Sequence, residues 1–162
     1  MDTRTAIRTR RSVRHFQDRP VSRQTLEAIV DAGRLAASGG GLQPWEFVVV
    51  TDAATRARLA ELSPYGRFLA TAPAAIVVLY TDASPYGKED CCSATATMLL
   101  AIHDLGLGAC WVVTDDEASM LACLGAPGGA HVGALIALGH PEITPDMPDK
   151  RPLRDVLHWE RF

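Results

Sequence analysis

The alternation of strand-like and helix-like segments along this chain predicts a three-layer α/β domain with a parallel sheet. Two apolar runs rich in β-branched residues, 47–50 and 74–80, indicate buried strands, and residues 90–105 have helical periodicity with charges only near the ends. The chain has 162 residues, of which 48% are hydrophobic, and this is enough for one substantial core. We therefore expect a single domain over residues 1–162.

The first part of the chain is predicted to contain two helices. A weak helical pattern covers residues 3–9 and runs into an arginine cluster. A stronger pattern follows Ser22, whose hydroxyl is suited to an N-cap, and continues to about Leu35. Ser38 and the three glycines after it end this helix.

The middle of the chain continues with strands and one short helix. After the strand 47–50, Asp52 can cap a helix over residues 53–62. The serine and proline that follow end this helix, and the strand 74–80 comes next.

The second half begins with the strongest helical pattern, residues 90–105, which Gly106 can end by adopting left-handed geometry. Segments 110–113 and 132–138 indicate two further buried strands, and a short helix is expected between them after residue 116.

The last segment differs in composition. Residues 141–152 contain four prolines and few apolar side chains, so they must cross a surface or reach another subunit. Apolar residues return at the very end, which predicts that the tail docks; they are Val156, Leu157, Trp159 and Phe162.

Charge and hydropathy exclude several classes of function. The formal net charge of −3 argues against general affinity for nucleic acid. The amino terminus lacks the apolar core of a signal peptide, and no apolar run approaches the roughly 20 residues that span a bilayer. We therefore expect a cytoplasmic protein that binds neither nucleic acid nor membrane.

Metal and nucleophile motifs are missing from the sequence. The four cysteines, at positions 91, 92, 110 and 123, include no CxxC pair, and the five histidines have no ligand spacing. The nucleotide motifs GxGxxG and GxxxxGK[ST] and the GxSxG elbow do not occur. Buried reduced thiols are the expected role of the cysteines, and no metal site is expected.

A basic cluster near the start has the composition of a phosphate site. Arg10, Arg11 and Arg14 surround Ser12, so one short segment offers guanidinium donors and a hydroxyl. The basic pair 150–151 lies beside prolines that restrict its conformation. Such arginines are often only a solvated face, but local positive charge in an acidic protein favours a specific anion.

Two glycine-containing segments suit a flat heterocycle. Glycines 39–41 precede the sequence LQPW, which places open backbone amides beside an aromatic residue. The small residues before Trp111 would also permit close approach of a ring. A simple helix stop and a cap leading into a strand are the alternative interpretations.

Taken together, these segments resemble the nitroreductase family of flavin-dependent reductases. The resemblance spans nearly the whole chain, and the order and spacing of its segments are specific. The segments are RRSVRHF, SGGGLQPWEFVVV, EDCCSATATMLLAIHDLGLGACW, LGAP with LIALGHP, and KRPLRDVLHWERF.

The resemblance implies an α+β fold in place of the parallel α/β sheet. This fold is a three-layer sandwich with a central, mostly antiparallel sheet flanked by helices. It also implies a homodimer with one FMN at each end of the interface and a domain-swapped carboxy-terminal arm. Residues 141–152 would then cross the partner subunit.

The resemblance also implies which residues bind FMN. The contacts to phosphate, ribityl and ring edge are Arg10, Arg11 and Ser12, with Arg14 in support and Lys150 or Arg151 as the late basic residue. The backbone contacts to the isoalloxazine are Trp111, Val112 and Val113. The loop supplied by the other subunit contains Ser38, Gly39 and Gly41. Gly41 stands where the family commonly has asparagine, which removes a side-chain amide from the substrate side.

The implied function is an FMN-dependent oxidoreductase with ping-pong kinetics. NADH or NADPH would reduce the flavin, and a nitroaromatic, quinone or similar small-molecule acceptor would reoxidise it. Because flavin N5 carries the hydride, no catalytic side chain is expected. The alternatives are a flavin-binding sensor or store with little turnover, a specialised flavin reaction such as reductive dehalogenation, and a nucleic-acid-binding module.

Overall fold

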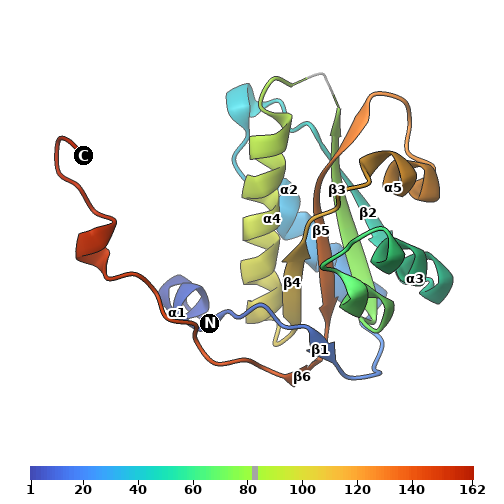
Figure 1. Cartoon of the computed structure of the whole chain (residues 1–162), viewed down its shortest axis with the longest axis horizontal. Helices are drawn as coiled ribbons and strands as arrows, with labels where there is room; N and C mark the ends of the chain where they lie inside the picture. Colours follow the sequence, from blue (N-terminus) through green and yellow to red (C-terminus); the bar gives the residue numbers. More distant parts are fainter. Residues whose placement is uncertain (82–83) are drawn as a thin grey trace.

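The computed structural model describes residues 1–81 and 84–162 of the chain. Within these residues the main sheet has four strands in the order β2-β3-β5-β4, so β2 and β4 are its edges (Figure 1). The strands are β2 (Trp45–Val50), β3 (Ala74–Thr81), β4 (Gly108–Val112) and β5 (Ala130–Gly139). Each neighbouring pair is antiparallel. The mostly antiparallel sheet implied by the family resemblance is confirmed, and the parallel sheet predicted from alternation is wrong.

The lengths of the connecting helices explain why alternation misleads. α3 (Ala53–Glu61) joins β2 to β3, and α5 (Glu117–Leu124) joins β4 to β5. With 9 and 8 residues these helices span only about 14 and 12 Å. Because the 8-residue strand β3 is about 27 Å long, neither helix can carry the chain back along the sheet.

α4 (Gly87–Asp104) is a connection of the other kind. Its 18 residues span about 27 Å, which matches the length of a strand. It joins β3 to β4, and these strands run in the same direction on either side of β5. The β3-α4-β4 unit is therefore a true crossover into which β5 is inserted.

Helices cover both faces of the sheet (Figure 1). α2 (Arg23–Arg34) and α4 form one core cluster with one face, and α3 and α5 form a second cluster around Leu59 with the other. Residues 74–79 and 134–139, in the two central strands, are buried between these layers without interruption. The predicted three-layer sandwich is therefore confirmed.

Local signals at the helix ends are also confirmed. The Ser22 hydroxyl accepts a hydrogen bond from the Thr25 amide at 3.1 Å, and the Asp52 carboxylate accepts one from the Thr55 amide at 2.8 Å. Gly106, with a φ of +74°, follows α4 in the left-handed conformation that favours glycine.

The two ends of the chain meet at one end of the sheet. α1 (Thr3–Thr9) is the predicted first helix, and it lies against the end of α4. β1 (His15–Phe16) pairs with β6 (Pro141–Ile143) in a small antiparallel sheet. The sequence did not predict this pairing, since residues 141–152 were expected only to cross a surface or to reach another subunit.

The carboxy-terminal arm, defined here as residues 144–162, leaves the body of the protomer (Figure 1). Each of its residues is exposed, including Trp159 at 78% and Leu153 at 71%. A short 3-10 turn at Leu153–Asp155 interrupts the arm, and similar turns occur at Gly39–Gly41 and Arg67–Ala70. The apolar tail therefore does not dock on its own protomer, and docking on another chain stays a prediction. Among the described residues, no helix combines the length and the apolar character needed to cross a bilayer.

Candidate functional site

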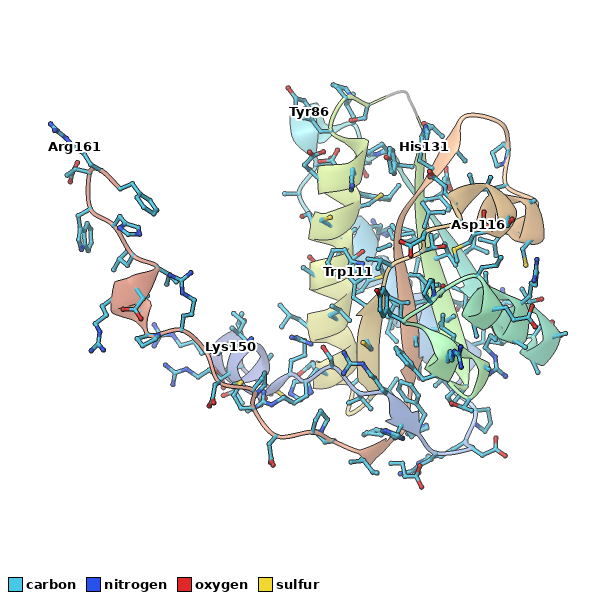
Figure 2. The ribbon with its side chains drawn as sticks, viewed as in Figure 1. Tyr86, Trp111, Asp116, His131, Lys150 and Arg161 are labelled. Carbon is cyan, nitrogen blue, oxygen red and sulfur yellow. The ribbon has the colours of Figure 1, made fainter. Side chains whose placement is uncertain are left out.

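Two segments that are far apart in the sequence form one basic cavity beside α1. This cavity, called the arginine cavity below, has a volume of about 530 Å³. Figure 2 shows Lys150 where the arm passes α1. The lining residues are Ile7, Arg10, Arg11, Ser12, Arg14, Pro145, Asp146, Met147, Pro148 and Lys150. The structure thus brings the predicted early and late basic segments together within one protomer.

The segment 10–14 is held in place by the outer edge of β4. Ser12 forms a parallel bridge with Ala109, and the Val13 amide donates to the Ala109 carbonyl at 2.9 Å. Gly108 permits this close approach, because a Cβ atom there would lie only 2.8 Å from Val13. The arginines are therefore presented along a rigid strand edge.

The basic side chains around the cavity differ in their internal contacts. Arg11 Nη1 donates to the carbonyls of Arg8 and Arg10, both at 2.9 Å. Arg14 Nη1 donates to the Ser12 carbonyl at 3.3 Å, and its guanidinium lies 5.9 Å from the centre of the Phe68 ring. Arg151 does not line the cavity; its guanidinium donates to the Asp155 carbonyl within the arm.

The residues predicted to contact the isoalloxazine ring, Trp111, Val112 and Val113, lie at the end of the same strand β4. Residues of an edge strand present their backbone groups alternately to the neighbouring strand and to the open side. Because Ala109 bonds outward to Val13, Trp111 also presents its N–H and C=O outward. Val112 is buried, and Val113, just beyond the strand, is 59% exposed. The Trp111 indole N–H is buried and has no hydrogen-bond partner among the described residues.

The predicted glycine segment lies at the other end of the protomer. The Gly39 amide donates to Asp90 Oδ1 at 2.9 Å, in the first turn of α4. The last turn of α4 instead contacts α1, where His103 Nε2 lies 2.7 Å from Thr9 Oγ1. Since α4 spans about 27 Å, Ser38, Gly39 and Gly41 cannot meet the arginine cavity of their own chain. Figure 2 shows this separation, with Tyr86 at one end of α4 and Lys150 near the other.

The outer face of α4 carries no charge along most of its length. Between Asp90 and Asp104 the helix contains no Asp, Glu, Lys or Arg. The side chains that reach the surface there are small or apolar, and they include Ser93, Ala96 and Leu100. An uncharged helix face of this kind is typical of a subunit interface.

A second large cavity, called the α2 groove below, was not predicted from the sequence. Its volume is about 870 Å³, and it lies between α2 and the free edge strand β2. It is lined by Asp18, Pro20, Val21, Arg23, Leu26, Glu27, Val30, Asp31, Arg34, Val49, Thr51, Arg56 and Pro73. No local sequence signal marks this groove, because its lining residues are spread over positions 18–73 of the chain.

Burial determines the ionisation of the groups near these sites. It raises the pKa of Cys91 to about 12 and also raises the pKa of Cys110, so both thiols remain protonated at neutral pH. Burial, followed by the nearby Arg10 and Arg11, lowers the pKa of His103. Among the described residues, no group of three His, Cys, Asp or Glu side chains could hold a metal ion.

Comparison with known proteins gives a family match over most of the chain. The model of the nitroreductase family matches residues 7–65 and 63–140. A protein of Archaeoglobus fulgidus, provisionally named NADH dehydrogenase/NAD(P)H nitroreductase, is 37% identical over 167 residues, which cover 96% of each chain.

Solved structures agree with this match. A protein of Desulfovibrio desulfuricans, provisionally described as a nitroreductase and solved in complex with FMN, has a TM-score of 0.90 at 32% identity. The alignment covers 100% of this chain and 99% of that one. An FMN-dependent nitroreductase of Clostridium difficile has a TM-score of 0.93 at 28% identity, over 99% and 100% of the two chains.

Proposed function

The chain belongs to the nitroreductase family, and from this premise we propose that it is an FMN-dependent NAD(P)H oxidoreductase. Electrons pass from NADH or NADPH through the flavin to a nitroaromatic, quinone or similar acceptor. The donor and the acceptor use the same exposed face in turn, which gives ping-pong kinetics. The observation that carries this proposal is the arginine cavity, where Arg10, Ser12 and Lys150 converge from two distant segments.

The donor set of the arginine cavity fits the phosphate of FMN. The cavity is lined by three arginines, a lysine and a hydroxyl, against a single carboxylate, that of Asp146. Planar guanidinium groups match the geometry of a phosphate dianion, and a lysine adds a point charge. Arg10, Ser12 and Lys150 would bind the phosphate, with Arg14 in support.

The edge of β4 fits the polar rim of the isoalloxazine. The outward backbone groups of Trp111 continue from the arginine cavity, and Val113 is exposed beside them. Bound FMN would supply the redox chemistry, and the protein's task is to position it and to stabilise its reduced form. N–H donors and positive charge beside the ring favour that anion, so no side-chain acid or base is needed.

The proposed active form is a homodimer with one FMN at each end of the interface. Within one protomer the glycine segment and the arginine cavity are separated by the length of α4. A twofold arrangement through the uncharged face of α4 would bring the glycine segment of one subunit to the cavity of the other. Ser38, Gly39 and Gly41 would then complete the partner's flavin site.

The exchanged arm is part of the same proposal. Leu153, Trp159 and Phe162 are exposed on a segment that makes no core of its own. The α2 groove lies beside the unpaired edge of β2, so it offers both apolar surface and backbone hydrogen bonds. We assign the end of the partner's arm as its occupant.

A visible spectrum, a light-scattering measurement and an anaerobic reduction experiment test this function. The purified protein should be yellow, should contain about one flavin per subunit, and should release FMN on denaturation. Light scattering should give a dimer, and NADH or NADPH should bleach the flavin under anaerobic conditions. A colourless protein with no affinity for FMN would refute the cofactor assignment. A flavin that binds but is not reduced would instead indicate the sensor or storage alternative.

A further inference from the structure

The loop that contains the three glycines, residues 38–43 and called the glycine loop below, has an unusual backbone. Gly40, Gly41 and Gln43 all have left-handed φ angles, of 57°, 69° and 49°. The loop is closed internally by the Ser38 hydroxyl, which accepts from the Gln43 amide at 3.1 Å. Its glycines carry no side chains to pack, and Leu42 is 56% exposed. The loop therefore needs support from the body of the protein to keep one conformation.

The first turn of α4 supplies this support through Asp90. This side chain is only 5% exposed, and its Oδ1 accepts from the Gly39 amide at 2.9 Å. The Tyr86 ring packs against the same glycine so closely that a Cβ atom at Gly39 would lie 2.4 Å from it. Two residues one turn apart thus hold the glycine loop against the start of α4.

The burial of the Asp90 side chain is energetically unfavourable. Its second oxygen, Oδ2, is buried and has no hydrogen-bond partner among the described residues. A buried carboxylate with a single hydrogen bond loses much of its hydration, and the amino-terminal end of a helix offsets only part of that loss. The bond to the Gly39 amide is the one hydrogen bond that the Asp90 carboxylate makes among the described residues, which points to a role in positioning Gly39.

We propose that Asp90 is a positioning residue for the flavin site of the partner subunit, because it fixes the glycine loop that closes that site. This inference rests on the proposed function. Asp90 cannot act on the arginine cavity of its own chain, because about 20 Å of α4 lies between Asp90 and the contact of His103 with α1. Its effect on FMN must therefore cross the subunit interface.

Substitutions at two positions test the positioning role. Asp90→Ala removes the acceptor and should raise the Kd for FMN about tenfold, which is the loss expected for one hydrogen bond to a charged group. Asp90→Asn keeps an oxygen in the same place and should restore most of the affinity. Gly39→Ala displaces the loop from Tyr86 without changing Asp90, and it should reproduce the loss. All three variants should remain dimeric by light scattering.

A control on the same helix separates loop positioning from general damage. Thr95 is fully buried in α4, and its hydroxyl also has no partner among the described residues. Thr95→Val should change the melting temperature without changing the Kd for FMN or the visible spectrum of the bound flavin. An equal loss of FMN affinity in Thr95→Val, or none in Asp90→Ala, would overturn the proposal.

A mixed dimer tests whether the effect crosses the interface. One subunit carries Asp90→Ala and the other carries Arg10→Ala, and the dimer is purified with two different tags. If Asp90 serves the partner's site, one site has both an intact arginine cavity and an intact loop, so the dimer should bind one FMN with normal affinity. If Asp90 serves its own chain, neither site is intact and no normal site should appear. A wild-type protein that binds no FMN would instead refute the proposed function itself.

Discussion

Replacing Arg10 or Lys150 by alanine is expected to weaken FMN binding while leaving the fold intact. Both side chains line the arginine cavity, and neither residue belongs to the buried core. A charge-assisted hydrogen bond to phosphate contributes about 1.5–3 kcal/mol, so its loss corresponds to roughly a 10- to 100-fold higher Kd. Arg10→Ala should lie toward the upper end of this range, because a guanidinium can offer two parallel N–H groups whereas a lysine offers one point charge.

Arg14→Ala should have a smaller effect, less than about tenfold. The Arg14 guanidinium already donates to the Ser12 carbonyl at 3.3 Å and lies over the Phe68 ring at 5.9 Å. Part of its donor capacity is therefore committed to the protein. The expected order of Kd values is Arg10→Ala above Lys150→Ala, and both above Arg14→Ala.

Titration of the apoprotein with FMN, followed by the quenching of flavin fluorescence at one fixed ionic strength, gives these values. Arg58→Ala is a matched control, because Arg58 is exposed on α3 and pairs with Glu61 at 2.7 Å on the far face of the sheet. Dimer mass and melting temperature should be the same for all four variants. If Arg14→Ala gave the largest Kd, or if Arg58→Ala weakened binding as much as Arg10→Ala, the phosphate assignment would be wrong.

Three further outcomes are expected. Alanine or serine at any one of the four cysteines should leave the rate of anaerobic flavin reduction by NADH or NADPH essentially unchanged, because burial raises the pKa of Cys91 to about 12 and raises that of Cys110. Stopped flow measures this rate. A rate about a hundredfold lower in a folded and FMN-replete variant would demonstrate thiol chemistry. The lowered pKa of His103 means that the unfolded chain binds its proton more readily, so the free energy of unfolding should fall as the pH falls below about 6.5. Urea unfolding gives the free energy of unfolding at a pH above and a pH below this value. The difference between the two free energies should be smaller in His103→Asn than in the wild type, and an equal difference would show that His103 is not its cause. Gly41→Asn should lower the melting temperature less than Gly41→Val, because asparagine tolerates a φ of +69° and no atom lies within 4 Å of its Cβ position; equal losses by calorimetry would contradict this.

Features of the fold that depend on neighbouring residues could be predicted from the sequence. The caps at Ser22 and Asp52 each use a bond to a backbone amide three residues on, so a short window contains the whole interaction. The strand β3 was predicted from a continuous run of apolar residues, and the helix α4 from apolar residues that repeat at helical spacing. The direction of the strands could not be predicted from such short windows, since it depends on α3 and α5 being shorter than the strands that they connect.

The candidate site shows the same division. The residues of the arginine cavity carry a compositional signal, and the structure brings Arg10, Ser12 and Lys150 together. Arg151 could not be separated from Lys150 by sequence, because only the path of the arm shows that it turns back to Asp155. The support that Asp90 gives to Gly39 joins residues 51 positions apart, and a lone carboxylate at the start of a helix has no pattern that reveals such a bond.

The edge strand β2 has a consequence for how this protein should be handled. Its sequence, WEFVVV, is strongly β-forming and contains one charged residue, and its outer edge pairs with no other strand among the described residues of the protomer. An isolated protomer thus exposes the kind of segment that templates intermolecular β pairing. Dilution or mild heating that separates the chains should therefore lead to precipitation rather than to a stable monomer, and storage at high concentration with saturating FMN should preserve the preparation.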